Sequence, residues 1–263
     1  MRPSKIKAKL SRREPVLVTA LALTDASLFE LASLMGFDGI WLDLEHHAHS
    51  VETAATLMRA ARVGTADVMA RPAKGEFMRL ARLLEAGANG IMYPRCDNAQ
   101  EARELVTWSK FHPKGKRGID SANADNPYCM MPLVPYVEYA NEQTFLVAQI
   151  EDPAALEHVE EIAAVDGIDV LFFGPGDFGV LSGIPGQSGH PSYAAAIARI
   201  AAAAERAGKA WGMPSPTIER TKELLDMGAR FIAHGADIIM VKTGLEAIQD
   251  KFATLGFTFD RSL

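Results

Sequence analysis

Eight short apolar runs alternate along the chain with longer helical patterns, and this alternation limits the possible folds more than any other feature. Runs rich in apolar and β-branched residues, each followed by a helix, predict repeated βα units and a parallel sheet. Eight such units favour a closed barrel over an open, doubly wound sheet. The expected strands are Val16 to Ala22, Gly39 to Leu44, Asp67 to Ala70, Gly90 to Tyr93, Phe145 to Ile150, Ile168 to Phe173, Ala210 to Met213 and Phe231 to His234.

Helical patterns fill the intervals between these runs. A weak internal repeat supports the boundaries, since Asp38-Gly39-Ile40, Asn89-Gly90-Ile91 and Asp166-Gly167-Ile168 each introduce an apolar run just after a helix. Glycine with Asp or Asn forms tight turns at helix ends. The expected helices are Ala26 to Leu34, Val51 to Arg62, Glu76 to Ala86, Ala99 to Trp108, Ala154 to Ala163, Tyr193 to Ala207, Ile218 to Met227 and a final helix near Ala236 to Ala253.

The length of the chain fits one barrel domain. Single α/β barrels commonly run to about 250 residues, and no linker divides this chain of 263 residues. We therefore expect residues 1–263 to form one (β/α)8 barrel, with residues 1–14 as a basic N-terminal arm that is solvated ahead of it. Two long connections, Lys110 to Thr144 and Gly174 to His190, are expected to be functional loops.

The formal net charge of −6 hides an asymmetry between the arm and the rest of the chain. Six of the 27 basic residues precede the first acidic residue, Glu14, so residues 14–263 carry 21 basic and 33 acidic residues. An acidic body argues against a nucleic-acid partner, which needs a basic footprint on the folded surface. No uncharged apolar run approaches the roughly 18 residues of a membrane span, so no membrane partner is expected.

The first apolar run has a second interpretation. Val16 to Ala22 follows basic residues, and Ala20-Leu21-Ala22 imitates the cleavage site of a secretory signal peptide. The run is short and interrupted by Thr19, and its removal would leave seven strands, so we favour a strand. Because Cys96 and Cys129 are too few for a disulfide framework, the reducing cytoplasm is the expected location.

The active site of a parallel barrel lies where its strands end, so polar residues that directly follow an apolar run are candidates. Four runs end in such residues. The segments are Asp43-Leu44-Glu45-His46-His47-Ala48-His49, Arg71-Pro72, Gln149-Ile150-Glu151-Asp152 and Gly174-Pro175-Gly176-Asp177.

Two of these segments suggest a metal site. Glu151 and Asp177 lie 26 residues apart, or one βα unit, so their carboxylates are expected on adjacent strand ends. Two carboxylates, with the remaining positions left to water or substrate oxygen, suit Mg²⁺ or Mn²⁺. The alternative is that Glu151 or Asp152 only caps the next helix.

The other segments suggest anion binding. Arg71 would place a permanent positive charge at the barrel mouth, where it could hold an enolate or a carboxylate, although a salt bridge on the rim explains it equally well. The Gly174 to Asp177 segment permits close backbone approach to a ligand, and its N–H groups could hold a carboxylate or phosphate, although such a sequence is more often only a turn. A phosphate could bind near Gly235 at the last helix, where helix capping is the alternative.

Three of the seven histidines lie within four residues, at His46, His47 and His49. Histidine near a barrel mouth is a natural general base, and Asp43, three residues before His46, could orient its ring. A zinc site is the alternative, since His47-Ala48-His49 resembles the paired histidines of metal-dependent amidohydrolase barrels. That site would need histidines at later strand ends, where this chain has Glu151 and Asp177.

Imine chemistry is not expected. A Schiff-base aldolase needs a lysine that projects from a strand into the barrel, where desolvation lowers its pKa. None of the expected strands contains a lysine, since Lys74 lies beyond the third strand and Lys209 precedes the seventh.

Together, these segments resemble the class II, metal-dependent pyruvate aldolases, the family that includes 4-hydroxy-2-oxoheptanedioate aldolase and 2-keto-3-deoxy-L-rhamnonate aldolase. The resemblance covers Val16 to Ile239 and rests on motifs in the family's order and spacing. They are Asp43 to His46, Arg71-Pro72, Gly87 to Pro94, Gly115-Lys116-Arg117-Gly118, Gln149-Ile150-Glu151, Asp166-Gly167-Ile168-Asp169 and Gly174 to Asp177.

The resemblance implies a TIM barrel of the phosphoenolpyruvate/pyruvate-binding type and an aldolase that reversibly cleaves a 4-hydroxy-2-oxoacid to pyruvate and an aldehyde. Glu151 and Asp177 would bind Mg²⁺ or Mn²⁺, with Co²⁺ as a further candidate. His46, oriented by Asp43, would be the acid/base residue, and Arg71 would stabilise the enolate oxygen. The remaining substrate-binding residues implied are Gln149, Gly176 and Asp177.

The resemblance further implies a homo-oligomer, specifically a hexamer built by exchange of the last helix. The chain departs from the family's usual pattern at Gly176-Asp177-Phe178-Gly179, at Ala233 to Asp237, and at His47 and His49. These departures affect the expected aldehyde specificity. The alternative functions are an oxaloacetate decarboxylase, another enolate or phosphoenolpyruvate-type lyase on the same barrel, and a non-catalytic keto-acid-binding protein.

Overall fold

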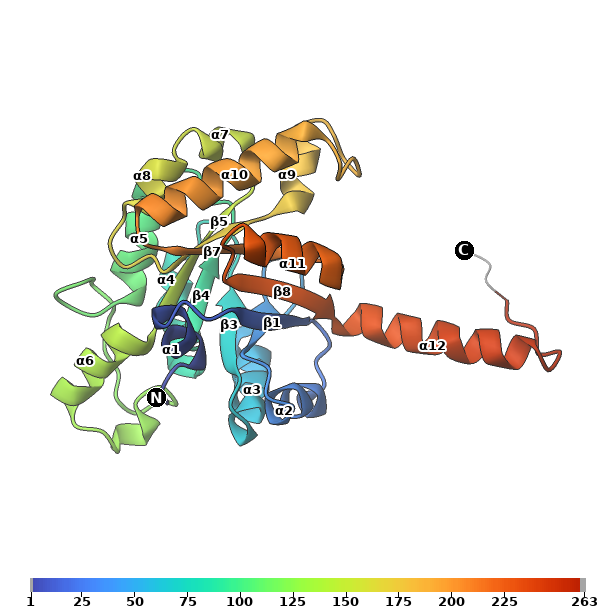
Figure 1. Ribbon diagram of the computed structural model, residues 1–263. Helices are drawn as coiled ribbons and strands as arrows, with labels where there is room; N and C mark the ends of the chain where they lie inside the picture. Colours follow the sequence, from blue (N-terminus) through green and yellow to red (C-terminus); the bar gives the residue numbers. More distant parts are fainter. Residues whose placement is uncertain (1, 261–263) are drawn as a thin grey trace.

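The computed structural model describes residues 2–260 and shows a closed barrel of eight parallel strands (Figure 1). Each strand pairs with the next along the chain, and β1 pairs with β8 to close the barrel. The expected TIM barrel is confirmed. The strands are β1 Val16–Leu21, β2 Gly39–Asp43, β3 Asp67–Arg71, β4 Gly90–Tyr93, β5 Phe145–Ile150, β6 Val170–Phe173, β7 Ala210–Pro214 and β8 Phe231–Ala236.

Helices follow the strands and cover much of the outside of the barrel. The expected helix Ala154 to Ala163 is divided into two short helices, and a turn of 3-10 helix, η1 Ala61–Val63, follows α3. Several helices begin at a side chain that accepts a first-turn N–H, such as Asp25, Ser50 and Asn98. The helices that follow the strands are α2 Ala26–Leu34, α3 Val51–Ala60, α4 Phe77–Ala86, α5 Ala99–Ser109, α7 Pro153–Leu156, α8 Val159–Ala163, α10 Pro191–Arg206 and α11 Ile218–Asp226.

The strands bury both faces, as parallel strands covered by helices do. Side chains that point into the barrel form one apolar cluster, which includes Val18, Met69, Val147 and Phe172. Alternate side chains of the same strands pack outward against the helices in a second, larger cluster. The inside of the barrel is therefore filled with apolar side chains.

The N-terminal segment is not solvated. It forms helix α1 Lys5–Ser11, and its Ile6 is fully buried in the cluster inside the barrel. Asp67, at the start of β3, accepts hydrogen bonds from Ser4 Oγ at 2.6 Å and from the Ile6 N–H at 2.9 Å. The expectation of a solvated arm is wrong, because a basic segment can also carry an apolar residue that closes the barrel floor.

The basic residues of α1 pair with acids at the N-terminal ends of strands. Lys5 and Lys9 contact the carboxylate of Asp38 at 3.2 and 2.7 Å, just before β2. Lys7 contacts Asp169 at 2.7 Å, just before β6. Three of the six basic residues that precede Glu14 are thus paired with acids of the barrel.

Each of the two long connections contains further helices. The first carries η2 Pro127–Cys129 and α6 Leu133–Gln143, and a buried ion pair between Arg117 and Asp125 at 2.8 Å lies within it. The second begins with α9 Pro175–Leu181, directly after β6. This second segment lies at the barrel mouth, where it contributes to the candidate site.

The last helix is α12 Asp237–Ala253. Its position in the sequence agrees with the expected final helix, but the sequence pattern does not predict its direction. It projects away from the barrel as a single rod (Figure 1). Its apolar residues are exposed, and Leu17, which points outward from β1, is 41% exposed. Within residues 2–260, no helix therefore covers Leu17 on the outside of β1. Across residues 2–260, the helices are too short or too polar to cross a membrane.

Candidate active site

The candidate site lies at the carboxyl ends of β2, β3, β5 and β6, where parallel strands of a barrel converge. Asp43 ends β2 and Arg71 ends β3, and the two residues are direct neighbours in the strand register. Gln149 lies in β5, Glu151 follows it, and Asp177 stands in the first turn of α9. The first four residues are at most 8% exposed, so their polar groups are held largely out of water.

Arg71 is held in place from several directions. Its Nε and Nη2 donate to the two carboxylate oxygens of Asp43 at 2.9 and 2.7 Å. Its Nη1 donates to Gln149 Oε1 at 3.3 Å, and the guanidinium lies 4.7 Å from the ring centre of Trp41. A bidentate pair of this kind fixes a guanidinium in position as well as in charge.

The carboxylate of Asp43 remains ionised. Burial by itself opposes its ionisation, but the hydrogen bonds and charge of Arg71 outweigh burial and hold the pKa of Asp43 below its ordinary value. The pair therefore presents a fixed positive charge next to a fixed negative charge at the barrel mouth.

Glu151 shows the opposite balance. Gln149 Nε2 donates to Glu151 Oε2 at 2.5 Å, and the Arg95 N–H donates to Oε1 at 3.0 Å. Burial, assisted by the nearby charge of Asp177, raises the pKa of Glu151 to about 7, although the hydrogen bond from the Arg95 N–H and the charge of Arg71 act in the opposite direction. A buried carboxylate beside a second carboxylate gains stability from a cation.

Gly174 makes room for Glu151. A Cβ atom at this position would lie 2.0 Å from Glu151 Oε2 and 2.9 Å from Gln149 Nε2. Gly174 is therefore needed for close packing against Glu151, and not only for a turn.

These residues fit a divalent cation of the magnesium type. The two candidate ligands are carboxylates, the oxygen donors that Mg²⁺ and Mn²⁺ prefer, and such ions commonly use one or two protein carboxylates together with substrate oxygens. In residues 2–260, no group of three or more His, Cys, Asp or Glu side chains is arranged to hold a metal. The rings of His47 and His49 lie 5.7 Å apart, without the further ligands that the zinc alternative requires.

His46 is placed differently from the sequence-based expectation. Its Nε2 lies 3.6 Å from Glu45 Oε2, whereas the imidazole near Asp43 is that of His47, at 3.9 Å from Oδ2. The reason is that Asp43 is already engaged, because it binds Arg71 and accepts the Glu45 N–H at 3.0 Å. In the described structure, therefore, Asp43 orients Arg71 and not His46.

Glu45 and Trp41 belong to the site but were not singled out from the sequence. Glu45 Oε2 lies 3.2 Å from Arg71 Nε, and burial raises the pKa of Glu45 above its ordinary value. The signal for Trp41 was the alternation of a strand, since residues 41 and 43 of β2 share one face, whereas Glu45 lies beyond the strand and had no such signal. Trp41 supports the guanidinium and Glu45 connects Arg71 to His46.

The departures in α9 face the protein interior. Phe178 is 3% exposed and packs on Phe173 and Tyr193, with ring centres 5.2 and 5.4 Å away. A Cβ at Gly179 would lie 2.1 Å from the Tyr193 hydroxyl, whereas a Cβ at Gly176 would meet no atom within 4 Å. Of these positions, only Gly176 opens space at the mouth.

The phosphate site considered near Gly235 has a competing occupant. The carboxylate of Asp237, which is 2% exposed, accepts the N–H groups of Ala22, Leu23 and Ile238 at 2.7 to 2.8 Å. Helix α12 has no side-chain cap at Ala236, but the buried carboxylate of Asp237 occupies this place and its charge opposes a phosphate there.

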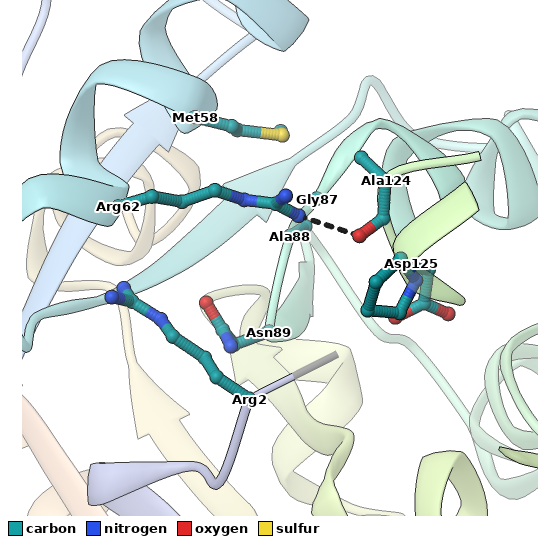
Figure 2. A pocket seen from close by; sticks show the side chains of 9 residues that line it. Arg2, Met58, Arg62, Gly87, Ala88, Asn89, Ala124 and Asp125 are labelled. Carbon is teal, nitrogen blue, oxygen red and sulfur yellow. Dashed lines mark hydrogen bonds between the residues drawn. The ribbon is translucent and has the colours of Figure 1, made fainter. Parts of the chain in front are cut away.

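A separate hollow of about 180 Å³ lies at the other end of the barrel (Figure 2). Arg62 reaches across it to the carbonyl of Ala124 at 2.8 Å, and Arg2 donates to the carbonyls of Gly64 and Ala66. Asn89, just before β4, accepts the Val68 N–H at 3.0 Å. These polar groups join the arm and the long connection to the barrel floor, away from the strand ends that carry the candidate site.

Comparison with known proteins gives consistent matches over nearly the whole chain. The model of the HpcH/HpaI aldolase/citrate lyase family matches residues 18–243. A 4-hydroxy-2-oxo-heptane-1,7-dioate aldolase from Shigella sonnei (strain Ss046) is 32% identical over 247 residues, which cover 94% of each chain. A 5-keto-4-deoxy-D-glucarate aldolase from Klebsiella pneumoniae is 29% identical over 250 residues, covering 95% of this chain and 97% of that protein. The crystal structure of an HpcH/HpaI aldolase from Desulfitobacterium hafniense DCB-2 superposes with a TM-score of 0.86 and 28% identity, covering 94% of this chain and 96% of the other.

Proposed function

The chain belongs to the HpcH/HpaI aldolase/citrate lyase family, and from that premise we propose that it is a divalent-metal-dependent aldolase. The reaction is the reversible cleavage of a 4-hydroxy-2-oxoacid to pyruvate and an aldehyde. The observation that carries the proposal is the fixed guanidinium of Arg71 on the same barrel mouth as the carboxylates of Glu151 and Asp177. Such an arrangement suits a reaction in which negative charge develops on an enolate oxygen.

Glu151 and Asp177 would hold Mg²⁺ or Mn²⁺, with Co²⁺ as a further candidate. When bound, the cation acts as a Lewis acid toward the carboxylate and keto oxygens of the substrate. Gln149 and the backbone N–H of Gly176 orient the oxoacid, since the first amides of a helix have no acceptor within it. Asp177 would then contact both the cation and the substrate.

In the cleavage direction, His46 removes the proton from the 4-hydroxyl group of the substrate. The C3–C4 bond then breaks, the former hydroxyl carbon becomes the carbonyl carbon of the aldehyde, and the bonding electrons pass into the enolate of pyruvate. Arg71 stabilises the developing charge because it is already oriented by Asp43 and needs no rearrangement. A proton returned to C3 gives pyruvate.

The test is an assay of pyruvate release from a panel of 4-hydroxy-2-oxoacids, with and without EDTA. We expect turnover that is lost on chelation and restored by Mg²⁺ or Mn²⁺. Arg71→Ala and Glu151→Ala should each lower kcat by about 100-fold to 1,000-fold, with unchanged circular dichroism. Arg220→Ala, which removes an arginine paired with Glu223 outside the barrel, is the matched control.

The same assay separates the alternatives. Release of pyruvate from oxaloacetate alone would replace the aldolase by a decarboxylase, and tight binding of oxalate without turnover would indicate a keto-acid-binding protein. Activity that survives complete chelation would contradict the metal-dependent reaction.

The partner that the structure suggests is a second copy of the chain. Helix α12 exposes an apolar surface that includes Ile239, Leu245, Ile248 and Phe252, each between 45% and 58% exposed. The barrel, in turn, leaves Leu17 of β1 41% exposed. The two surfaces complement each other in chemistry, and a helix of one copy can cover the open barrel face of another. We therefore propose a homo-oligomer built by exchange of α12, with a hexamer as the specific state to test.

Both cysteines are free, with Cys96 buried and Cys129 exposed. An exposed free thiol is typical of a reducing compartment, which supports the proposal of a cytoplasmic enzyme.

A further inference from the structure

Lys74 lies at the barrel mouth and takes no part in the proposed reaction. It stands three residues after Arg71, in the loop between β3 and α4. Its ammonium group donates to the backbone carbonyl of Arg95 and to the carboxylate of Asp97, both at 2.5 Å, and to the carboxylate of Glu101 at 3.2 Å. An ammonium group has three N–H donors, and these acceptors use all of them. Lys74 is therefore held firmly against the segment that follows β4.

The backbone of Arg95 is bound on both sides of its Cα atom. On one side, its N–H donates at 3.0 Å to Oε1 of Glu151, one of the two proposed metal ligands. On the other side, its carbonyl accepts the ammonium of Lys74, and the N–H of the same peptide unit, which belongs to Cys96, donates to the carbonyl of Gln149 at 2.9 Å. One short segment thus connects Lys74 to the carboxylate of Glu151.

These hydrogen bonds hold an unusual backbone conformation. Arg95 has a φ of +46°, in the left-handed region that side chains other than those of Gly, Asn and Asp rarely adopt. A residue keeps such a conformation only where its surroundings impose it. Without the ammonium of Lys74 on its carbonyl, Arg95 could relax toward a negative φ, and its N–H would turn away from Glu151.

The side chain of Arg95 does not account for this conformation. Its Nη2 lies 3.7 Å from Asp152 Oδ2, the side chain is 40% exposed, and its Nε has no hydrogen-bond partner among the described residues. The hydrogen bonds of the backbone are shorter, at 2.5 to 3.0 Å. The backbone, and not the guanidinium, therefore connects Lys74 with Glu151.

The orientation of the Glu151 carboxylate depends on a donor at each oxygen. Oε2 accepts Gln149 Nε2 at 2.5 Å, and Oε1 accepts the Arg95 N–H. Hydrogen bonds of this kind orient the carboxylates that ligate metals, and they affect metal affinity nearly as much as the ligands do.

We propose that Lys74 is a positioning residue for the metal site, which acts through the backbone of Arg95 to hold the carboxylate of Glu151 in its orientation. This inference rests on the proposed metal-dependent function and adds a residue to it. The loop after β3 then serves both charges of the site, because it follows the strand that carries Arg71 and fixes the acid that would hold the cation.

The experiment compares the full chain of the wild type with Lys74→Met, Arg95→Asn and Arg95→Val. Titration calorimetry on EDTA-treated protein measures the affinity for Mn²⁺. Hydrogen–deuterium exchange with mass spectrometry measures the protection of the Arg95 N–H in the absence of metal, and circular dichroism checks the fold. Lys222→Met, at an exposed lysine of α11, is the matched control.

We expect Lys74→Met to bind Mn²⁺ about tenfold more weakly and to exchange the Arg95 N–H faster, whereas Lys222→Met should match the wild type. Arg95→Asn and Arg95→Val both remove the guanidinium, but asparagine adopts a left-handed φ far more readily than a β-branched residue does. Arg95→Asn should therefore keep an affinity near that of the wild type, and Arg95→Val should lose affinity as Lys74→Met does.

Three results would overturn the inference. The first is unchanged Mn²⁺ affinity in Lys74→Met, which would confine Lys74 to holding the loop. The second is equal loss in Arg95→Asn and Arg95→Val, which would assign the effect to the guanidinium, and the third is unchanged affinity in Arg95→Val. If Lys74→Met loses its fold, the two Arg95 variants decide.

Failure of the proposed function looks different. The wild type itself would then bind no Mn²⁺, whereas the exchange of the Arg95 N–H would still respond to Lys74→Met, because that hydrogen bond exists without metal.

Discussion

At the scale of single residues, the site depends on a few contacts that leave no space for substitution. Arg71 and Asp43 form a buried bidentate pair, and Glu151 lies against the backbone of Gly174. The pair fixes a positive charge, whereas the glycine permits an acid to lie where a side chain would otherwise stand. Catalytic geometry is thus set as much by a missing Cβ as by the charged groups.

The first prediction concerns this glycine. Gly174→Ala should remove most of the activity, because its Cβ would lie 2.0 Å from Glu151 Oε2 and must displace that carboxylate. We expect at least a tenfold weaker affinity for Mn²⁺, measured by titration calorimetry, and a parallel loss of kcat. Substitution of a group that supports a metal ligand typically lowers metal affinity by about tenfold to a hundredfold.

Gly176→Ala is the matched control for that substitution, because a Cβ there meets no atom within 4 Å. It should bind Mn²⁺ like the wild type. Equal affinities in Gly174→Ala and the wild type would show that Glu151 does not need the space.

At the scale of elements, helix α1 shows how a charged segment becomes part of the core. Its Ile6 fills the floor of the barrel, and its lysines pair with acids that precede β2 and β6. The buried acid at this junction, Asp67, has a pKa raised to about 6 by burial, since its hydrogen bonds with Ser4 and Ile6 compensate only in part. The ionised form of Asp67 therefore lowers the stability of the folded state.

The second prediction follows from this pKa. Between the ordinary pKa of 3.8 and about 6, the folded chain binds more protons at Asp67 than the unfolded chain does, so the contribution of Asp67 to stability falls as pH rises through this range. From pH 5 to pH 8, the wild type should lose about 1 kcal/mol of unfolding free energy relative to Asp67→Asn, which cannot ionise.

Urea unfolding of both proteins at pH 5 and pH 8, at one protein concentration, measures this difference. Asp166→Asn, which alters an exposed acid, serves as the control and should show no such dependence. A pH-independent difference between the wild type and Asp67→Asn would mean that Asp67 titrates alike in the folded and unfolded chains.

At the scale of the whole molecule, a (β/α)8 barrel normally covers its strands with its own helices. Here α12 extends from the barrel with its apolar side chains in solvent, while the outward-facing Leu17 of β1 is exposed. Burial of one large apolar side chain stabilises a protein by about 1.5–3 kcal/mol. Packing of α12 against another copy would therefore contribute substantial free energy of association. Assembly then completes the outer layer of the barrel.

The third prediction concerns this assembly. The wild type should have a mass that is a multiple of 28.5 kDa, and Leu245→Glu with Ile248→Glu should reduce it to 28.5 kDa in light scattering. The reason is that both side chains are exposed in one copy, at 58% and 53%, so acidic replacements disturb only a surface that another copy covers.

Met130→Glu is the matched control, since Met130 is an apolar residue 82% exposed on the long connection, away from α12. It should keep the assembled mass. A wild type of 28.5 kDa, or a double variant with unchanged mass, would contradict the exchange of α12.

Much of the fold and part of the site can be predicted from the sequence. All eight expected strands occur, because burial on both faces produces apolar runs that are visible in the sequence. Arg71, Gln149, Glu151 and Asp177 meet at the barrel mouth because strand ends converge there. Helices α1, α6 and α9 were missed, since short or partly polar helices give little periodic signal.

The pairing of side chains at the candidate site was not predictable in the same way. Spacing placed His46 and Asp43 close together, but the structure pairs Asp43 with Arg71, 28 residues away, and leaves His47 nearest to it. Spacing along a loop does not determine which partner an acid selects. The contact between neighbouring strand ends wins because it is bidentate and buried.

The sequence by itself therefore determined the number and order of the strands, the closed barrel, and the four segments that reach the mouth. Only the tertiary structure decided that the basic arm closes the barrel floor, that Asp43 serves Arg71, and that α12 leaves the barrel from a carboxylate that also holds the rim of the mouth. The physical reason is that the two kinds of information act over different separations along the chain. Hydrophobic periodicity is recorded within a few residues, whereas the choice of partner for a buried charge depends on groups that folding brings together from distant parts of the chain.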